Sequence, residues 1–416
     1  MSNIRFKKRG LGLRTRIVRC LLRPLLNVPA APVILLVIML QAFWLLYDQQ
    51  ITKAVTHKLP KVYEKPTNDS PLSPFYSEPY DGPARAFPKY KYDFPCGPLV
   101  HVNKLQDRSV TNEGFLFVKE MKSGSTTLAG ITARIARNVA QREHHVTNST
   151  TACTARMVHT RARKYNRRIQ DKSFVWSVIR EPVSRLFSKF YHFEVSRANV
   201  QPSLATFQKF INTNEVNDYA YYFKTLTMRK HMNPYRDDLY ELFLKNLLSG
   251  YNFLGITERM DESLAVLQLL LNLKTEDMLY LSAKTSGSYE LFRRKCIKIQ
   301  ETNVTQSMKE YVYSEMFEKF TEPDVLVYRA VNKSLDLTIE QIGRTKVDQT
   351  IKQLQYALVL AQEKCKSVAF PCTDDGTIQE PNDCLFTDVS CGYKCLDEVG
   401  KSLETDKDFL ALSGNI

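Results

Sequence analysis

The chain is long enough to bury a sizeable core, and its positive charge is concentrated at one end. It has 416 residues, 44% of them hydrophobic, and a formal net charge of +14, which allows one large domain or two smaller ones. Eight lysines and arginines precede residue 25, where no acidic residue offsets them, so the remainder carries only about +6. Because this excess is local, the composition argues against a nucleic-acid partner for the body of the protein.

An apolar run follows the basic N-terminal segment. AAPVILLVIMLQAFWLLY, residues 30–47, is apolar apart from Gln41 and is long enough to cross a bilayer as a helix. With the basic residues before it, the run predicts a cytosolic tail at 1–24, a transmembrane signal anchor at 25–47 and a lumenal body. A cleaved signal peptide is the alternative, but the basic region is long and no clear A-x-A site follows.

The segment after the anchor, residues 48–95, has little apolar periodicity. Nine of the 18 prolines fall between Pro60 and Pro98. A proline-rich stretch of this kind predicts an extended stem that holds the folded part away from the membrane.

The cysteines fit a lumenal body. Eight follow the anchor, an even number in an oxidising compartment, which predicts disulfide bonds: Cys96, Cys153, Cys296, Cys365, Cys372, Cys384, Cys391 and Cys395. The group from Cys365 onward could instead bind zinc, but it has no CxxC pair and no histidine follows His231. Four sequons, at Asn68, Asn148, Asn303 and Asn332, fit glycosylation in the secretory pathway.

In the body of the chain, short apolar runs alternate with helical patterns. This alternation predicts an α/β fold with a parallel sheet covered by helices over 96–345, followed by a helical, cysteine-rich extension over 346–416. The expected strands are 115–118, 174–179, 253–257 and 278–281. The expected helices are 126–139, 182–197, the segment DESLAVLQLLL that begins at residue 261, 237–248 and 347–364.

The run VKEMKSGSTT, residues 118–127, lies where the first expected strand leads into a helix. In parallel sheets, ligands bind beyond the carboxyl ends of the strands, and helix N-termini there favour anions. The run is neither a Walker A sequence, because Lys122 precedes Gly124, nor G-x-G-x-x-G. It therefore predicts a phosphate-binding loop of another kind.

The order strand, K-S-G-[ST]-T, helix resembles the phosphate loop of the sulfotransferase superfamily. The resemblance implies a P-loop-like parallel sheet and a 5′-phosphosulfate site for 3′-phosphoadenosine-5′-phosphosulfate (PAPS). The residues that it assigns to this site are Lys122, Ser123, Gly124, Ser125, Thr126 and Thr127.

A second segment strengthens the resemblance. SFVWSVIREPVSRLFSKFYHF, residues 173–193, places Arg180 at the end of an expected strand and Ser188 inside the next helix. Sulfotransferases hold the 3′-phosphate of PAPS with an arginine and a serine at this spacing, so the resemblance assigns these two residues to that phosphate. It covers roughly residues 113–345.

Within the superfamily the chain most resembles the Golgi galactose 3-O-sulfotransferases, which include the galactosylceramide enzyme. Three segments carry the likeness: KSGSTTL, ITERMDESLAVLQLLL and DVLVYRAVNKSL. It implies a Golgi type II membrane protein whose acceptor is the 3-OH of galactose on a glycolipid or glycoprotein. The hexuronyl 2-O-sulfotransferases of heparan sulfate are the alternative, because they share the loop and a similar VIR[DE]P segment, although DESL is more like the galactose group. The segment MVHTRARKY departs from the galactose group, because it lacks the phenylalanine of the H-x-R-F pattern.

Sulfuryl transfer needs a base for the acceptor hydroxyl, charge stabilisation and alignment, as phosphoryl transfer does. We expect Lys122 to stabilise charge at the bridging oxygen, supported by loop amides, and no metal is required. His159 lies near the place where related Golgi enzymes carry a catalytic histidine, and neutral imidazole suits a base near pH 7. Arg161, on the H-x-R pattern, is the expected acceptor-binding residue.

Other residues could serve as the base. Histidines compete at three positions: His144, His145 and His192. Some sulfotransferases use a glutamate eight residues after the loop lysine, but Gly130 stands there, which leaves Glu120 as a weaker candidate.

Two other protein classes remain open. An inactive, membrane-anchored glycan-binding protein would be expected to have a damaged phosphate loop, whereas Lys122, Thr126, Arg180 and Ser188 are all present. A kinase or other NTP-using enzyme would be expected to carry Walker A or kinase signatures, which the sequence lacks.

Overall fold

The computed structural model describes residues 79–106, 112–147, 150–159, 165, 167–213, 219, 223, 237–386, 389 and 391–414. The predicted cytosolic tail, the signal anchor and the first part of the stem lie outside these residues. Within the described ranges, no helix is both long enough and apolar enough to span a bilayer. The described residues all belong to a single compact unit.

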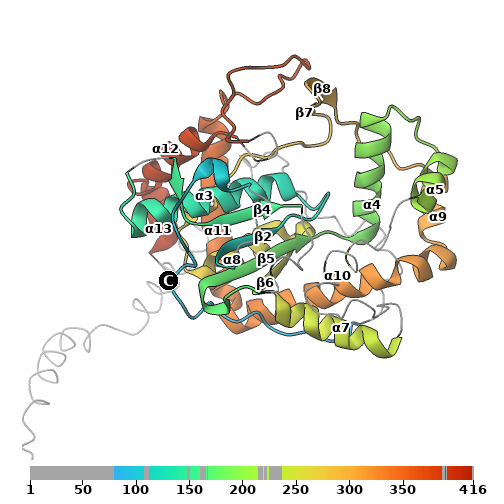
Figure 1. Ribbon diagram of the computed structural model, residues 1–416, viewed down its shortest axis with the longest axis horizontal. Coiled ribbons are helices and arrows are strands. Elements are labelled where there is room, and N and C mark those ends of the chain that lie inside the picture. The colour runs from blue at the N-terminus through green and yellow to red at the C-terminus, as the bar shows by residue number, and fades with distance from the viewer. Residues whose placement is uncertain are drawn as a thin grey trace, which may run out of the picture. The chain divides into compact units, whose positions relative to one another are not determined.

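A parallel sheet of four strands lies at the centre of this unit (Figure 1). Its strands are β2 (Gly114–Val118), β4 (Ala155–Val158), β5 (Ser173–Ile179) and β6 (Phe253–Ile256), in the order β4-β2-β5-β6. Every residue of β2, β5 and β6 is buried, as expected for strands covered on both faces. The prediction of an α/β fold with a parallel sheet is therefore confirmed.

The strand order creates a switch point between β2 and β5. From β2 the chain moves through a helix to β4 on one side, and then returns across β2 to β5 on its other side. Connections that leave neighbouring strands in opposite directions open a crevice at the carboxyl ends of those strands, which is where ligands bind in such sheets.

Three helices follow three of these strands directly. They are α3 (Ser125–Glu143) after β2, α4 (Pro182–Phe190) after β5 and, beyond a 3-10 turn η6 (Thr257–Arg259), α8 (Met260–Leu271) after β6. The Glu181 carboxylate caps α4 by accepting from the amides of Val183 and Ser184. The single helix expected over 182–197 instead changes after Phe190 into a π-helix, η5 (Tyr191–Arg197).

The remaining helices surround this framework. In Figure 1, α11 (Arg344–Lys364), α12 (Tyr393–Leu403) and α13 (Lys407–Ser413) gather near α3, whereas α5 (Leu204–Thr213) and α9 (Gln306–Val312) lie near α4. Two further helices, α7 (Asp237–Gly250) and α10 (Glu315–Ile342), pack against each other. The 3-10 turns η2 (Val102–Lys104) and η4 (Gln170–Lys172) complete the helical elements.

One strand prediction was wrong, and several strands were not predicted. Residues 278–281 form no strand, because the preceding 3-10 helix η7 (Thr275–Met278) ends there and the chain continues without pairing. The strand β4 was missed because its polar Arg156 hides the apolar pattern; this side chain is buried and donates to the Lys104 carbonyl at 2.8 Å. Two small sheets, β1 (Val100–His101) with β3 (Thr151–Ala152) and β7 (Tyr289–Phe292) with β8 (Lys295–Lys298), were also not expected.

The ends of the folded body differ from the expected boundaries. Residues 79–95 were assigned to an extended stem, yet Phe87 is buried and its amide donates to Thr338 Oγ1 at 2.9 Å, and Tyr90 packs edge-on against Phe174 of β5. Likewise, α11 spans the expected boundary at 345 and packs on α8. Single apolar side chains without periodicity fill the core in the first place, whereas residues buried at helical spacing along α11 do so in the second.

All eight cysteines within the described residues are paired, which confirms the prediction of disulfide bonds. The pairs are Cys96–Cys153, Cys296–Cys372, Cys365–Cys395 and Cys384–Cys391. The alternative of a zinc site among the C-terminal cysteines is therefore wrong, because a cysteine in a disulfide has no thiolate to offer.

Two of the four sequons lie within the described residues. The Asn303 side chain is exposed in a loop. In contrast, Asn332 is half-buried in α10 and its amide oxygen accepts from Arg259 Nη1 at 2.8 Å. Asn303 is thus the better placed of these two for a glycan.

Candidate active site

The phosphate loop connects β2 to α3 at the switch point of the sheet. Lys122 adopts φ 65° and Gly124 adopts φ 70° as the N-cap of α3, and a Cβ at Gly124 would lie 3.3 Å from Met260 Cε. Left-handed residues that turn the chain into a helix point successive amides at one spot and form an anion-binding concavity. The loop that the sequence indicated therefore has the geometry to bind phosphate.

Ser123 sits inside this loop with an unusual environment. Its side chain is fully buried, and its Oγ has no hydrogen-bond partner within the described residues. A buried hydroxyl in this state needs an explanation, because nearly all buried polar groups are paired. An oxygen of a bound phosphate or sulfate would satisfy it.

Arg180 lies at the carboxyl end of β5, beside the loop. Its Nη1 donates to the Lys122 carbonyl at 3.4 Å, and its backbone amide donates to the Tyr219 hydroxyl at 2.8 Å. Its Nε is buried without a hydrogen bond in the described structure, although Glu258 Oε1 is 3.7 Å away. Arg180 and the loop are thus brought together, and Arg180 retains a donor for a ligand.

The other predicted cofactor-binding residues lie on α3 and α4. Ser125 is the first residue of α3 and is buried, and Thr127 Oγ1 accepts from the Ala283 amide at 3.5 Å. Thr126, between them, is half-buried. Ser188 is half-buried in the second turn of α4.

The Lys122 ammonium has a strongly perturbed environment. The Lys122 pKa is lowered from 10.5 to about 8, mainly by burial; the charge of Glu290 acts to raise it, and the charges of Arg180, Lys284 and Arg197 act to lower it. A lysine with this pKa is still mostly protonated at neutral pH and is poised to interact with negative charge.

His159 lies at the carboxyl end of β4, directly beside the start of the loop. Because β4 pairs with β2 in the register Val118↔Val158, the exposed imidazole reaches the Lys119 carbonyl, 2.7 Å from Nδ1. A carbonyl can only accept, so Nδ1 carries the proton and Nε2 carries the lone pair of the neutral ring. This is the tautomer that a general base requires.

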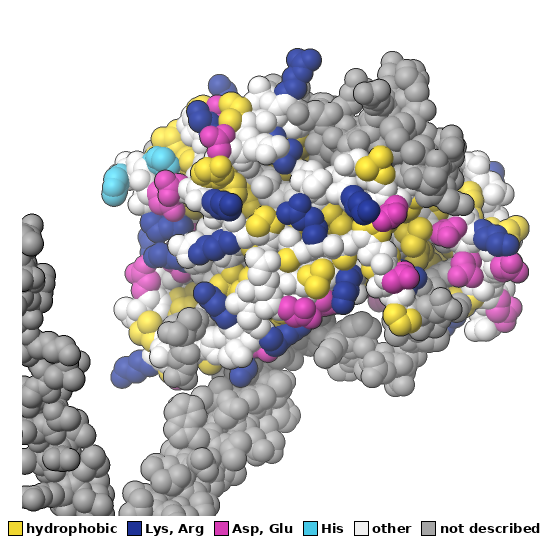
Figure 2. Space-filling model, turned by 90° about the horizontal axis from the view of Figure 1, so that it is seen from below, with side chains coloured by type: hydrophobic (Ala, Val, Ile, Leu, Met, Phe, Trp, Pro, Cys, Tyr) yellow, Lys and Arg dark blue, Asp and Glu magenta, His cyan; other side chains and the backbone are white. Residues whose placement is uncertain are grey.

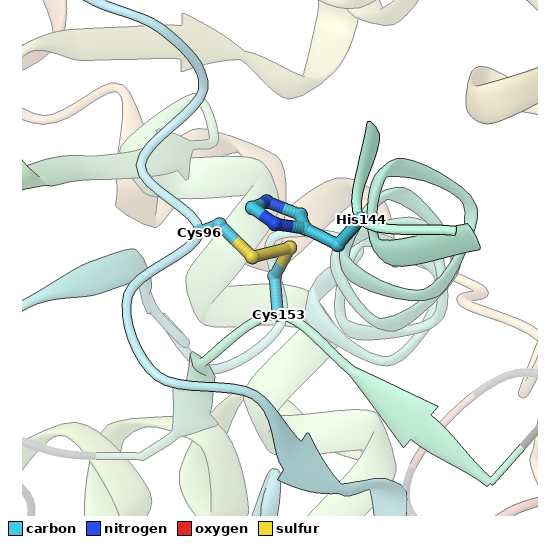
Figure 3. A group of neighbouring side chains, drawn as sticks. All are labelled: Cys96, His144 and Cys153. Atoms are coloured by element: carbon cyan, nitrogen blue, oxygen red, sulfur yellow. A yellow bond between two sulfur atoms is a disulfide. The ribbon is translucent and has the colours of Figure 1, made fainter. Parts of the chain in front are cut away.

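Two of the competing histidines are far from the phosphate loop. His144 and His145 follow the C-terminal end of α3, which has 19 residues, so they lie about 28 Å from the loop. Figure 3 shows His144 against the Cys96–Cys153 disulfide. These three residues are the one group with metal-ligand spacing within the described residues, but the two sulfurs are bonded to each other and cannot bind an ion as thiolates.

The other two alternatives are buried. Glu120 is fully buried and forms an ion pair with Arg185 at 3.3 Å, so its carboxylate belongs to the core. His192, on η5, is also buried, and its pKa falls to about 3 because of burial and then of the nearby Lys122 charge. So weak a base gives little driving force for proton removal.

One residue that the structure places near Lys122 was missed by the sequence interpretation. Glu290 of β7 is 2% exposed and accepts from Arg197 Nε at 2.7 Å, with Lys284 Nζ 3.6 Å away. No local pattern indicates this, because YELFRRKC shows no apolar periodicity that would predict burial of the glutamate. Only the approach of η5, β7 and the loop before β7 creates the cluster.

The predicted acceptor-binding residue, Arg161, lies outside the described residues. On the face shown in Figure 2, basic side chains lie over the left and centre, and acidic ones are more frequent toward the right. The described part of this face therefore carries both signs of charge.

The comparison with protein families agrees with this geometry. The model of the sulfotransferase family matches residues 111–329, just over half of the chain. The matched region runs from the start of β2 through the phosphate loop, His159, Arg180 and Glu290 into α10. No curated protein and no solved structure matches the chain. The loop, the sheet and the family match together show that this chain belongs to the sulfotransferase family.

Proposed function

We propose that the protein transfers a sulfuryl group from PAPS to the 3-hydroxyl of galactose on a glycolipid or glycoprotein. The observation that carries the donor assignment is a pair of orphaned polar atoms at the switch point. Ser123 Oγ in the loop and Arg180 Nε beside it are both buried without a hydrogen-bond partner in the described structure. A nucleotide with two anionic groups would supply acceptors for both.

The residues present fit such a donor. The loop amides, Lys122 and the hydroxyls of Ser123, Ser125 and Thr126 would hold the 5′-phosphosulfate, and Arg180 with Ser188 would hold the 3′-phosphate. The bound donor supplies the sulfuryl group and a phosphate leaving group. Lys122 would place its positive charge where negative charge grows during transfer, in a partly dehydrated site where such charge is most effective.

The acceptor hydroxyl requires a base, and His159 is positioned to be one. When the ring is neutral, donation from Nδ1 to the Lys119 carbonyl leaves the lone pair on Nε2, so the ring takes the hydroxyl proton at Nε2 as the hydroxyl oxygen attacks sulfur. Because His159 is exposed, a large glycan can reach it without any rearrangement of the core.

Donor identity can be tested by binding. We expect retention on immobilised 3′,5′-adenosine bisphosphate and release by the free compound, with much weaker retention on ATP. Equal retention on both resins would favour an NTP-using enzyme. Retention without product from any acceptor would favour an inactive glycan-binding protein.

Acceptor identity needs a direct assay. The lumenal part is incubated with labelled PAPS and separate galactosides, galactosylceramide and heparan sulfate. We expect product with galactose-terminated acceptors and none with heparan sulfate. The opposite result would replace the proposal with a hexuronyl 2-O-sulfotransferase, the alternative that rests on the shared phosphate loop and a similar VIR[DE]P segment.

We also propose a Golgi location, with the anchor at 25–47 and the catalytic part in the lumen. The support is the basic segment before an apolar run and four disulfides in the described body. The test is a glycosidase-sensitive mass shift in the full chain. Asn303→Gln should reduce the shift, whereas Asn332→Gln, at a half-buried and hydrogen-bonded side chain, should leave it unchanged.

A further inference from the structure

Glu290 brings together side chains from three separate elements. Its Oε1 and Oε2 accept from Arg197 Nε at 2.7 Å and from Arg197 Nη2 at 3.0 Å, a two-point contact with η5. Lys284 Nζ approaches Oε2 at 3.6 Å from the preceding loop, and His192 Nε2 approaches Oε1 at 3.5 Å. The carboxylate is thus the common centre of one arginine, one lysine and one imidazole.

The same loop also touches the phosphate-binding region. Next to Lys284, the Ala283 amide donates to Thr127 Oγ1 in the first turn of α3 at 3.5 Å. Lys284 itself adopts φ 56°, a strained conformation for a residue other than glycine. The cluster around Glu290 is therefore attached to the N-terminal end of α3, where Lys122 lies.

The charge on Glu290 needs a reason beyond packing. Taking a carboxylate out of water is unfavourable, and an apolar residue could hold this hairpin against η5 without that penalty. Nor does Glu290 suit the role of base: burial raises its pKa, but the hydrogen bonds from Arg197 and the nearby positive charges outweigh that effect and lower the pKa. The carboxylate therefore stays ionised, and its contribution to the cluster is its negative charge.

We propose that Glu290 is a positioning residue for the transfer reaction, which holds Arg197, Lys284 and His192 together and is the counter-ion of Arg197 and Lys284 next to the phosphate loop that carries Lys122. This rests on the proposed function in one respect, that Lys122 acts as a cation in the reaction.

The charges that face Lys122 come from each neighbouring element. Arg180 follows β5, Arg197 lies on η5, Lys284 lies in the loop before β7, and Glu290 lies on β7 itself. The three cations lower the pKa of Lys122 and Glu290 raises it. His192 on η5 remains neutral, because burial and the Lys122 charge hold its pKa at about 3, so it does not replace Glu290 as a source of charge.

The decisive variant is Glu290→Gln, which keeps the shape and removes the charge. Without Glu290, three cations and burial act on Lys122 unopposed, so its ammonium should lose the proton at lower pH, by about one pH unit. The readout is competitive labelling of the full chain with acetic anhydride between pH 6 and 10, with Lys122 acetylation measured by mass spectrometry. This measurement does not require any enzymatic activity.

A matched control exists at the other end of α3. Asp277 is a fully buried carboxylate that also accepts from both nitrogens of one arginine, with distances of 3.1 and 3.0 Å from Arg142. Asp277→Asn should lower thermal stability but leave the Lys122 labelling midpoint in place. Glu290→Asp, which restores the charge on a shorter side chain, should keep the midpoint near that of the unaltered protein.

Activity gives a second readout. In Glu290→Gln we expect the alkaline limb of kcat/KM to move to lower pH in parallel with the labelling midpoint, while affinity for 3′,5′-adenosine bisphosphate changes less than about threefold. A folded Glu290→Gln protein whose Lys122 midpoint equals that of the unaltered protein would overturn the proposal. If the midpoint shifts but no acceptor is sulfated by the unaltered protein, the counter-ion role stands and the proposed function fails.

Discussion

Two buried ionic clusters flank the phosphate loop, and they differ in balance. In the first, Arg185 pairs with both Glu120 and Asp324, and all three side chains are at most 1% exposed. In the second, around Lys122, the Glu290 carboxylate pairs with Arg197 and Lys284, and Arg180 lies 3.7 Å from Glu258. We call the first cluster closed, because two carboxylates share one arginine in the core, and the second open, because its cations outnumber its carboxylates beside the phosphate loop.

The closed cluster supports the open one. Asp324 also accepts from the Tyr219 amide at 3.1 Å, and the Arg185 guanidinium lies over the Tyr219 ring, 4.4 Å from its centroid. The Tyr219 hydroxyl in turn contacts the backbone amide and carbonyl of Arg180. The closed cluster thus supports the backbone of Arg180 through Tyr219, and Arg180 belongs to the open cluster.

The largest effect is expected in the open cluster, from Lys122→Ala. Removing the cation from the transfer site should lower kcat/KM by about 10³-fold and also weaken donor binding. In the unaltered protein, activity that depends on the charged form should fall as pH rises through the Lys122 pKa of about 8. A kcat/KM profile from pH 5.5 to 9.5 for each protein measures the loss of activity in the variant and the pH dependence of the unaltered protein. If kcat/KM of the unaltered protein stayed constant at alkaline pH, the role proposed for Lys122 would be contradicted.

A substitution in the closed cluster should lower the stability of the fold. Arg185→Met leaves two buried carboxylates without their cation, which should lower the free energy of unfolding by about 3–5 kcal/mol. Chemical denaturation measures this. The control is Lys319→Met at the exposed Glu315–Lys319 pair, where no measurable change is expected. If both variants were equally stable, the closed cluster would not be the frame that we describe.

His159→Ala tests the base without touching either cluster. We expect turnover to fall by about 10²-fold while affinity for 3′,5′-adenosine bisphosphate stays nearly constant, because the acceptor proton has no contact with the nucleotide. The control is His144→Ala, at the far end of α3, which should retain full turnover. Near-normal turnover in His159→Ala would mean that another group removes the proton.

Arg180→Ala and Ser188→Ala separate the two contacts proposed for the 3′-phosphate. Loss of the charged donor should weaken nucleotide binding by about 1.5–3 kcal/mol, and loss of the hydroxyl by about 0.5–1.5 kcal/mol. Calorimetric titration with 3′,5′-adenosine bisphosphate, compared with adenosine 5′-phosphate, isolates the 3′-phosphate. Unchanged affinity in both variants would show that this phosphate binds elsewhere.

Much of the site could be recognised from the sequence because its signals are local. The glycine and hydroxyl residues of KSGSTT sit between a short apolar run and a helical pattern, and Arg180 follows another apolar run, so strand, loop and helix could be placed from neighbouring residues alone. The even number of cysteines after the apolar run likewise predicted disulfides. The pairing of the cysteines could not be predicted from the sequence, because it depends on which segments of the chain meet in space.

Tertiary structure alone decided the features that join distant segments. Glu290, Arg197 and Lys284 come from three elements whose sequences look like ordinary surface, and burial turns them into one electrostatic unit. Phe87 belongs to a proline-rich segment that reads as a stem, yet it fills the core because an apolar side chain needs no periodicity when it acts singly. His159 was chosen by its place in the sequence, but only the pairing of β4 with β2 brings its ring to the Lys119 carbonyl and sets the tautomer that its role requires.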